Sequence, residues 1–259
     1  MRHDRELVLT PYAEAVQEQL HDALRLVEQL ITQRPDFDPT VDERRFTVVA
    51  SDYAATVVLG QLLAELAAGA PAVTVDLQPP RDAFEQRVRR DEVDLLLVSD
   101  GVCQGRLDEM PQECLFEDRF MLCAWRDNAA VQPDLSIDEF EALPYVQYGM
   151  GHEARLADRS LEWLNIRRKV ELRTESQLLV PFVLTKSSFG CPRTETTGPN
   201  DADQAELKII EPPFNLPTIR QSAIWHPRRN LDPAHRWLRD RLRIAAVSSQ
   251  IEGPGPTAG

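Results

Sequence analysis

The sequence predicts an α/β protein that is made of two lobes and preceded by a long helix. Short apolar strands alternate with helical stretches, which is typical of βαβ units around a mostly parallel sheet. The apolar run 116–125 has charged residues inside it and suits a strand that crosses from one lobe to the other. The strand expected at 218–225 is long enough to return to the first lobe. Two such crossings predict a hinged clamshell with a ligand cleft between the lobes.

The first predicted element is a helix that begins at Thr10-Pro11, because threonine caps free backbone N–H groups and proline fits the first helical position. Apolar residues then recur at spacings of three and four, as in a heptad seam. We expect residues 1–34 to hold a linker helix that dimerises along this seam. An ordinary amphipathic helix packed on its own domain is the alternative. The seam consists of Ala13, Val16, Leu20, Ala23, Val27 and Leu30.

The first lobe is expected over residues 44–123 together with 217–247. Its helices are rich in Leu and Ala, and its strands are continuous apolar runs, as in buried strands. The predicted elements are strand 45–50, helix 54–68, strand 73–77, helix 82–90, strand 93–98, the returning strand 218–225 and a helix over 232–247 that begins at Asp232-Pro233.

The second lobe is expected over residues 124–216. Serine and threonine caps mark two of its helices. The tail, 248–259, contains Gly-Pro-Gly-Pro and is predicted to be disordered. The predicted elements are helix 136–143, strand 144–148, helix 158–164, strand 170–173, helix 175–184 after the cap Thr174, and strand 207–210.

Composition excludes several classes of function. The net charge is -13, from 42 acidic and 29 basic residues, and no basic face that could neutralise phosphates is evident. No apolar run approaches the ~18 residues of a membrane span, and the charged N-terminus is no signal peptide, so we expect a cytoplasmic protein. The cysteines lack metal-site spacing, so we expect reduced thiols and neither a metal nor a cofactor. They are Cys103, Cys114, Cys123 and Cys191.

No motif supports an enzyme. Gly149-Met150-Gly151 lacks the third glycine of a dinucleotide fingerprint, and no phosphate loop, nucleophile elbow or His-Glu-x-x-His is present. His3, His21 and His235 are expected at exposed helical or terminal positions.

Polar residues at the ends of predicted strands in the first lobe are the first candidates for ligand contacts. Ser51, Asp52 and Tyr53 follow the first strand where a helix starts, so free N–H groups and short polar side chains can face a ligand. Ser99 and Asp100 end the third strand, at the edge where open sheets bind ligands. A plain helix cap by Ser51 or Asp52 is the alternative, and both roles can coexist.

The second lobe offers a matching set. Tyr148 and His152 follow a strand, Thr174 and Ser176 lie at a helix start, and His226 follows the returning strand near a possible hinge. Turn or cap chemistry is the alternative for the first four residues, and a structural histidine is the alternative for His226.

Five segments in a fixed order resemble the LysR-type transcriptional regulators, in the branch of the nodulation regulators and the regulators of aromatic degradation. The resemblance runs from Arg5 to about Arg243. The segments are RELVLTPYA at 5–13, RFTVVASDY at 45–53, LFEDRF at 115–120, EPPFNLP at 211–217, and WHPR at 225–228 with DPAHRWL at 232–238.

The resemblance implies a two-lobed effector domain of the periplasmic-binding-protein-like type 2 fold. It also implies a homodimer or tetramer, control of transcription, and effector contacts from the strand-end segments above. The inducer is expected to be small and aromatic or flavonoid-like.

Two departures from the family pattern stand out. The winged helix-turn-helix should lie before Leu7, so DNA is expected to be reached only through a domain that these residues do not contain. Residues 186–203 hold few apolar side chains and several Pro and Gly, so we expect a loop or disorder there, either natural or from a reading-frame disturbance. A stand-alone small-molecule binding protein and a non-functional or dominant-negative truncated regulator remain alternative interpretations.

Overall fold

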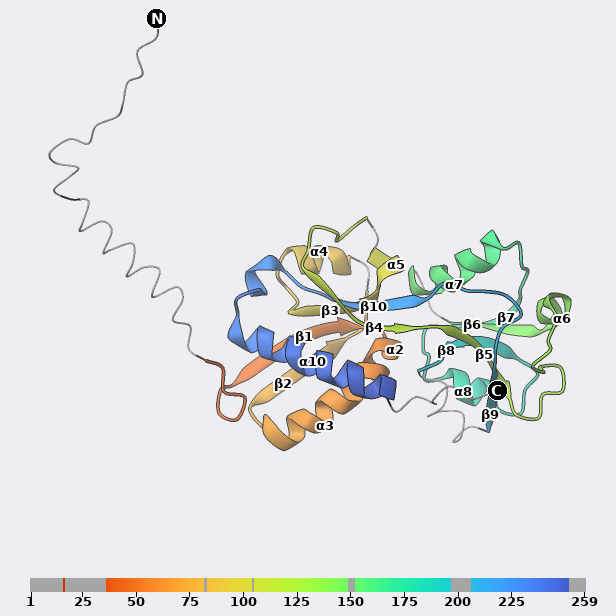
Figure 1. Ribbon diagram of the computed structural model, residues 1–259, viewed down its shortest axis with the longest axis horizontal. Helices are drawn as coiled ribbons and strands as arrows, with labels where there is room; N and C mark the ends of the chain where they lie inside the picture. The colour runs from red at the N-terminus through yellow and green to blue at the C-terminus, as the bar shows by residue number, and fades with distance from the viewer. Residues whose placement is uncertain are drawn as a thin grey trace, which may run out of the picture. The chain divides into compact units, whose positions relative to one another are not determined.

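The computed structural model describes the chain in several segments (Figure 1). The chain divides into two compact units, Met1–Phe37 and Asp38–Gly259, and the second holds both sheets. Of the predicted linker seam only Val16 is described, and it is helical; the other five seam residues lie outside the described part. The structure describes Val16 and residues 36–81, 83–103, 105–148, 152–196 and 206–251.

The first lobe is built on a five-stranded sheet with the order β2-β1-β3-β10-β4. β1 pairs in parallel with β2 and β3, whereas β10 runs antiparallel to both β3 and β4. Four strands therefore point the same way, and only the returning strand β10 opposes them. The strands are β1 (Arg44–Ala50), β2 (Val73–Gln78), β3 (Leu95–Ser99), β4 (Gln112–Asp118) and β10 (Ile219–Ile224).

The second lobe repeats this plan with the strand order β7-β6-β8-β5-β9. β6 is parallel to β7 and β8, and β5 is antiparallel to β8 and β9. The single opposing strand is again the one that enters from the other lobe. The strands are β5 (Phe120–Trp125), β6 (Pro144–Tyr148), β7 (Lys169–Thr174), β8 (Gly190–Thr194) and β9 (Leu207–Ile210).

Helices connect the parallel strands in both lobes. Between β1 and β2 one continuous helical stretch passes from α2 through a π-helical turn, η1, into α3. The Ser136 cap is confirmed: its hydroxyl accepts from Glu139 N–H, and the Glu139 carboxylate accepts from Ser136 N–H in a capping box. The helices are α2 (Asp52–Ala54), η1 (Ala55–Leu59), α3 (Gly60–Gly69), α4 (Phe84–Arg89), α5 (Asp100–Cys103), α6 (Ile137–Ala142), α7 (His152–Trp163), α8 (Val180–Leu184), the 3-10 turn η2 (Pro227–Arg229) and α10 (Pro233–Ile251).

The first crossing between the lobes lies at Arg119. The run 116–125, predicted to be one crossing strand, is two strands: β4 ends at Asp118 in the first sheet and β5 starts at Phe120 in the second. The lobe boundary expected between residues 123 and 124 therefore falls at Arg119, because 120–125 pair with β8 and β9. The second crossing connects β9 to β10.

The expectation of a loop or disorder over 186–203 is wrong for Gly190–Thr194, which forms the buried strand β8. β8 lies between β6 and β5 in the second sheet, and β6 pairs with it only at Gly190. Pro192 has no backbone N–H, but it is therefore not required to donate a hydrogen bond towards β6. A Cβ atom at Gly190 would meet side-chain atoms of Leu122 at 3.4 Å and Leu143 at 3.5 Å, which are ordinary contact distances. Residues 197–203 lie outside the described part.

Two helix boundaries also differ from expectation. α8 starts at Val180 rather than at Glu175, because Thr174 ends β7 and residues 175–179 form a bend and a turn, with Pro181 near the start of the helix. α10 continues through residues 248–251, which were predicted to be disordered. The helix-breaking glycine and proline come only at Gly253 and Pro254.

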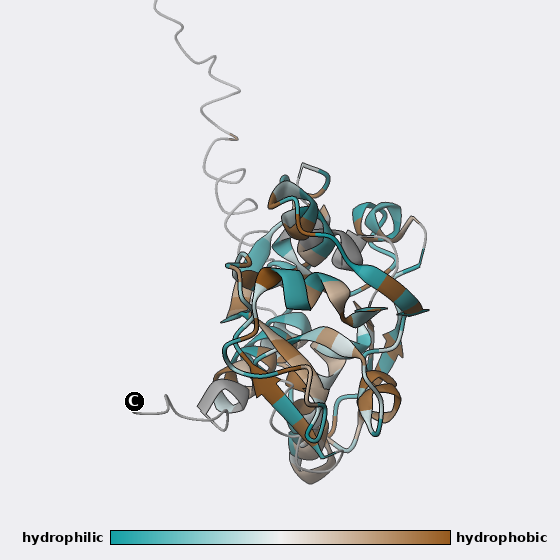
Figure 2. Cartoon of the chain, turned by 90° about the vertical axis from the view of Figure 1, so that its right-hand side faces the viewer, coloured by the Kyte–Doolittle hydropathy of each residue, from teal (hydrophilic) through white to brown (hydrophobic). Residues whose placement is uncertain are grey.

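The cores of the lobes lie between sheets and helices, and in Figure 2 hydrophobic residues occur on both strands and helices. In the first lobe, fully buried Leu96 and Val88 belong to the cluster formed by β3 and α4. In the second lobe one cluster surrounds Tyr145 and Phe140, and another contains Cys123 and Cys191, which pair across β5 and β8.

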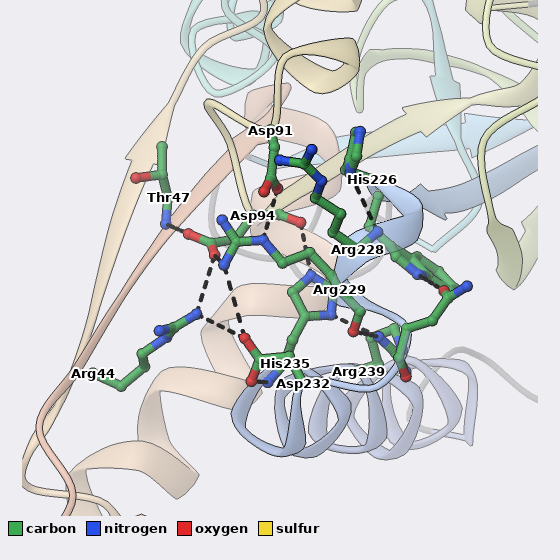
Figure 3. A network of polar contacts seen from close by, with 12 residues as sticks. Arg44, Thr47, Asp91, Asp94, His226, Arg228, Arg229, Asp232, His235 and Arg239 are labelled. Carbon is green, nitrogen blue, oxygen red and sulfur yellow. Dashed lines mark hydrogen bonds and ion pairs between the residues drawn. The ribbon is translucent and has the colours of Figure 1, made fainter. Parts of the chain in front are cut away.

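An ion-pair network joins the start of β1 to the beginning of α10 (Figure 3). Arg229 reaches Asp91 at 2.7 Å and Asp94 at 3.2 Å, and Arg44 reaches Asp232 at 3.0 Å. Asp94 also accepts from the backbone N–H of Thr47 at 2.8 Å. The network therefore links β1, the turn before β3, and the segment that leads into α10.

His235 is part of the same region, and the expectation that it is exposed is wrong: it is 0% exposed. It lies on the buried face of α10 with Leu238 and Leu242, at helical spacing. Its Nδ1 is 2.7 Å from Arg239 Nη1, and because a guanidinium only donates, Nδ1 accepts and Nε2 donates to the carbonyl of Asp94 at 2.7 Å. Burial, with the nearby positive charge of Arg239, lowers the pKa of His235.

Candidate functional site

The carboxyl edges of the two sheets face each other across the crossings. The carboxylate of Asp52 on α2 accepts hydrogen bonds from the backbone N–H groups of Gln177, at 2.6 Å, and Leu178, at 3.4 Å, in the second lobe. On another side of the same region, α5 of the first lobe contacts α7 of the second. The region predicted to bind a ligand is therefore where the lobes contact each other.

The side chains of Ser51 and Tyr53 both lie at this edge. Ser51 is buried and caps α2, with its hydroxyl accepting from Ala54 N–H at 3.3 Å, so the predicted cap is present. The Tyr53 hydroxyl donates to Asp118 at 2.7 Å, and the Tyr53 ring packs edge-on against Phe116. Both residues are used structurally in this state of the protein.

Asp118 is a buried carboxylate at the first crossing. Besides Tyr53, it accepts from the backbone N–H groups of Arg119 at 2.8 Å and Thr196 at 3.3 Å. Burial raises the pKa of Asp118, and these hydrogen bonds oppose the rise. Thr196 follows β8 and therefore belongs to the second lobe. Asp118, like Asp52, is thus a carboxylate of the first lobe that accepts a hydrogen bond from the backbone of the second lobe.

Ser99 and Asp100 contact the returning strand. The Ser99 hydroxyl donates to the side-chain oxygen of Gln221 at 3.1 Å, and both residues are buried. Asp100 accepts from the Ser222 hydroxyl and lies 3.7 Å from Arg220, which also pairs with Glu117 at 3.3 Å.

In the second lobe, Thr174 lies at the carboxyl end of β7, directly beside Tyr148 at the end of β6. The Thr174 hydroxyl accepts from Ser176 N–H at 3.1 Å, which is a turn rather than the predicted helix cap. His152 begins α7. The side chains of Tyr148 and His152 lie outside the described part.

His226 does not join these residues. β10 is antiparallel to β3, with Gln221 opposite Ser99 and Ile224 opposite Leu96. His226, beyond Ile224, is therefore at the far end of the sheet, about 16 Å along the strand from Gln221 at ~3.3 Å per residue. There its ring nitrogen Nδ1 accepts from Arg228 N–H and caps η2, so the structure does not bring His226 together with the other candidate residues.

Sequence reasoning missed three residues of this edge: Asp118, Gln177 and Gln221. Asp118 lies inside an apolar run of the sequence, and a charged residue in such a run could have indicated a functional or buried polar position. Gln177 and Gln221 contact partners more than a hundred residues away, 125 for Asp52 with Gln177 and 122 for Ser99 with Gln221, and no local pattern encodes that.

This edge offers hydroxyls, amides and carboxylates. Within the described ranges no group of three or more metal-binding side chains occurs. None of the helices that the structure describes is long and apolar enough to cross a membrane. Three cysteines are buried, and only Cys114 is exposed.

The model of the LysR substrate binding domain matches residues 40–246, which is most of the chain. This chain belongs to the LysR family. Among LysR relatives, Nodulation protein D 1 of Bradyrhizobium elkanii is 30% identical over 251 residues, covering 95% of this chain and 77% of the relative. Nodulation protein D of Bradyrhizobium sp. (strain ANU 289) is 29% identical over 259 residues, covering 98% and 76%.

Solved structures of LysR regulators share the fold. The regulatory domain of MexT, a transcriptional activator in Pseudomonas aeruginosa, superimposes with a TM-score of 0.61 at 20% identity, covering 78% of this chain and 100% of that one. HinK, a LysR family transcriptional regulator from the same species, gives 0.61 at 16% identity, covering 91% and 80%. The predicted two-lobed, type 2 periplasmic-binding-protein-like fold is thereby confirmed, and the family consists of transcriptional regulators rather than enzymes.

Proposed function

We propose that this LysR effector-binding domain senses a small aromatic or flavonoid-like inducer between its two lobes. The observation that carries the proposal is the contact of Asp52 with Gln177 and Leu178, since it spans the lobes at the carboxyl edge of β1. A ligand placed there touches both lobes and changes the balance between open and closed arrangements. Ser51, Ser99 and Thr174, which end strands on the two sides, are proposed to form the polar part of the site.

The lobe equilibrium is proposed to control transcription through a helix-turn-helix domain outside these residues. The chain is proposed to pair with a copy of itself along the linker seam, as a dimer or as part of a tetramer, so that lobe closure in one copy changes the position of the DNA-binding domains. The match to the LysR substrate binding domain supports a regulator that responds to a bound small molecule.

A thermal-shift screen of flavonoids, salicylates and benzoates tests this proposal. At a hundredfold excess over the dissociation constant, a ligand stabilises its protein by about 2.7 kcal/mol, which is readily measured as a higher melting temperature. We expect at least one compound to stabilise the wild type.

Asp52→Ala serves as the site variant and Asp76→Ala as its matched control. Asp76 lies on the edge strand β2, half exposed, 3.7 Å from an exposed arginine, Arg45. Loss of charged hydrogen bonds across the lobes should weaken the affinity of Asp52→Ala for the compound by about tenfold or more, whereas Asp76→Ala should behave as wild type. A compound whose shift is unchanged in Asp52→Ala would place the site elsewhere. Absence of any stabilising compound would refute an aromatic inducer.

A further inference from the structure

Gln221 has a side chain whose hydrogen bonding is incomplete at the edge where the lobes meet. It lies on β10, opposite Ser99 on one side and Phe116 on the other, and it is 0% exposed. Its carboxamide oxygen accepts from the Ser99 hydroxyl at 3.1 Å. The amide nitrogen, Nε2, is buried and has no hydrogen-bond partner.

An orphan donor in this position is costly. Buried polar groups in folded proteins are almost always paired, and an unpaired one destabilises the fold. Apolar neighbours on the same strand, Ala223 and Ile224, are buried at 2% exposure without such a cost. A methionine would fill the volume of Gln221 without leaving a donor unpaired. Gln221 thus lowers stability where an apolar residue would not. Such a residue is best accounted for by a role in function, here as a hydrogen-bond donor to a ligand.

The charges near this edge indicate what kind of acceptor Nε2 takes. Asp52, Asp100 and Asp118 all place carboxylates at the carboxyl edge of the first sheet. Arg220, the cation that pairs with Asp100, is shared with Glu117. A ligand carboxylate would be repelled there, whereas an uncharged carbonyl oxygen accepts a hydrogen bond without that penalty.

We propose that Gln221 is a specificity-determining residue of the effector site, and that its amide donates to an uncharged carbonyl oxygen on the ligand's ring system. This inference rests on the proposed function, because it assigns a contact within the same site. Ser99 then acts as a positioning residue, since its hydroxyl holds the carboxamide oxygen and turns the nitrogen away from itself.

Flavanone and flavan test the proposal, because they share one ring system and differ in a single ring carbonyl. The wild type should bind flavanone about tenfold more tightly than flavan, the usual scale for one buried hydrogen bond. Gln221→Met should bind the two compounds within about twofold of each other. Asn128→Asp is the matched control: Asn128 is also a buried amide with an unpartnered nitrogen, but it lies in the loop after β5, and its substitution should leave the preference intact.

A second measurement needs no ligand. In a Ser99→Ala background, which removes the hydroxyl that Gln221 accepts from, Gln221→Met should raise the melting temperature. A fall would show that an ordered water or an unseen structural contact satisfies the amide, and would overturn the proposal. An unchanged flavanone preference in Gln221→Met would also overturn it while leaving the proposed function in place. If neither compound bound the wild type, this inference would fail, whereas the proposed function would fail only if the salicylates and benzoates of the thermal-shift screen also gave no stabilisation.

Discussion

The Asp94→Ala substitution removes the carboxylate at the centre of the network in Figure 3. The Asp94 side chain is 10% exposed, and its partners are Arg229 at 3.2 Å, Arg44 at 3.7 Å and the backbone N–H of Thr47 at 2.8 Å. Breaking a buried ion pair costs about 3–5 kcal/mol when a charge is left alone. Here the cost of the lost pairs is smaller, because Arg229 keeps Asp91 and Arg44 keeps Asp232.

Thr47 N–H loses its side-chain acceptor at the same time, which adds about 1–3 kcal/mol. We therefore expect a total near 3 kcal/mol, or a melting temperature lower by roughly 6–12 °C for a domain of this size. The free energy of unfolding should fall less in Asp94→Asn, because the asparagine side-chain oxygen can still accept a hydrogen bond from the backbone N–H of Thr47. Urea titration should give the same order of stability for the variants.

The control is Glu171→Gln, which breaks an exposed pair with Lys169 whose side chains are 40% and 60% exposed. Exposed pairs contribute about 0–1 kcal/mol, so the control should melt close to wild type. If Asp94→Ala lowered the melting temperature no more than Glu171→Gln does, the network would not stabilise the fold.

Two further predictions concern pH and assembly. Because the pKa of His235 is lowered in the folded state, the unfolded chain binds a proton first as pH falls below about 6.5, and stability should drop over the range down to the folded pKa. Urea midpoints between about pH 7.5 and 5.5 should fall less steeply in His235→Gln than in wild type; equal slopes would assign the loss to other groups. Light scattering should find the wild type larger than a monomer and Leu20→Glu monomeric, because a charge within the seam opposes helix pairing. A wild-type chain that is already monomeric at micromolar concentration would contradict the seam.

The parts of the fold that could be predicted were those with local causes. Asp232-Pro233 marked the beginning of α10, and the apolar run before Ser51 marked β1, because caps and strand runs are encoded within a few residues. Ser51, Asp52 and Ser99 were predicted at strand ends that face a ligand. These strand ends do lie at the edge where the two lobes contact each other. Their roles as effector contacts stay a prediction.

The failures have non-local causes. β8 looked like a loop because Gly190 and Pro192 oppose strand formation locally, but pairing with β5 and burial between the neighbouring strands override that preference. The expectation for His235, by contrast, failed against a local signal: its spacing from Leu238 and Leu242 places it on the buried face of α10. His226 was grouped with the other candidate residues because its position after the returning strand does not reveal the direction of that strand, which runs antiparallel to β3.

The opposing strand in each sheet has a consequence for folding. β10 lies between β3 and β4, yet it is made about a hundred residues after β4 along the chain. Until that strand arrives, β4 has no partner in its sheet, and the first lobe has two exposed strand edges where one sheet should be continuous. The first lobe is thus completed only after the whole second lobe has been synthesised. Such long-range pairing slows folding, and it makes the two lobes a single folding unit even though each has its own hydrophobic core.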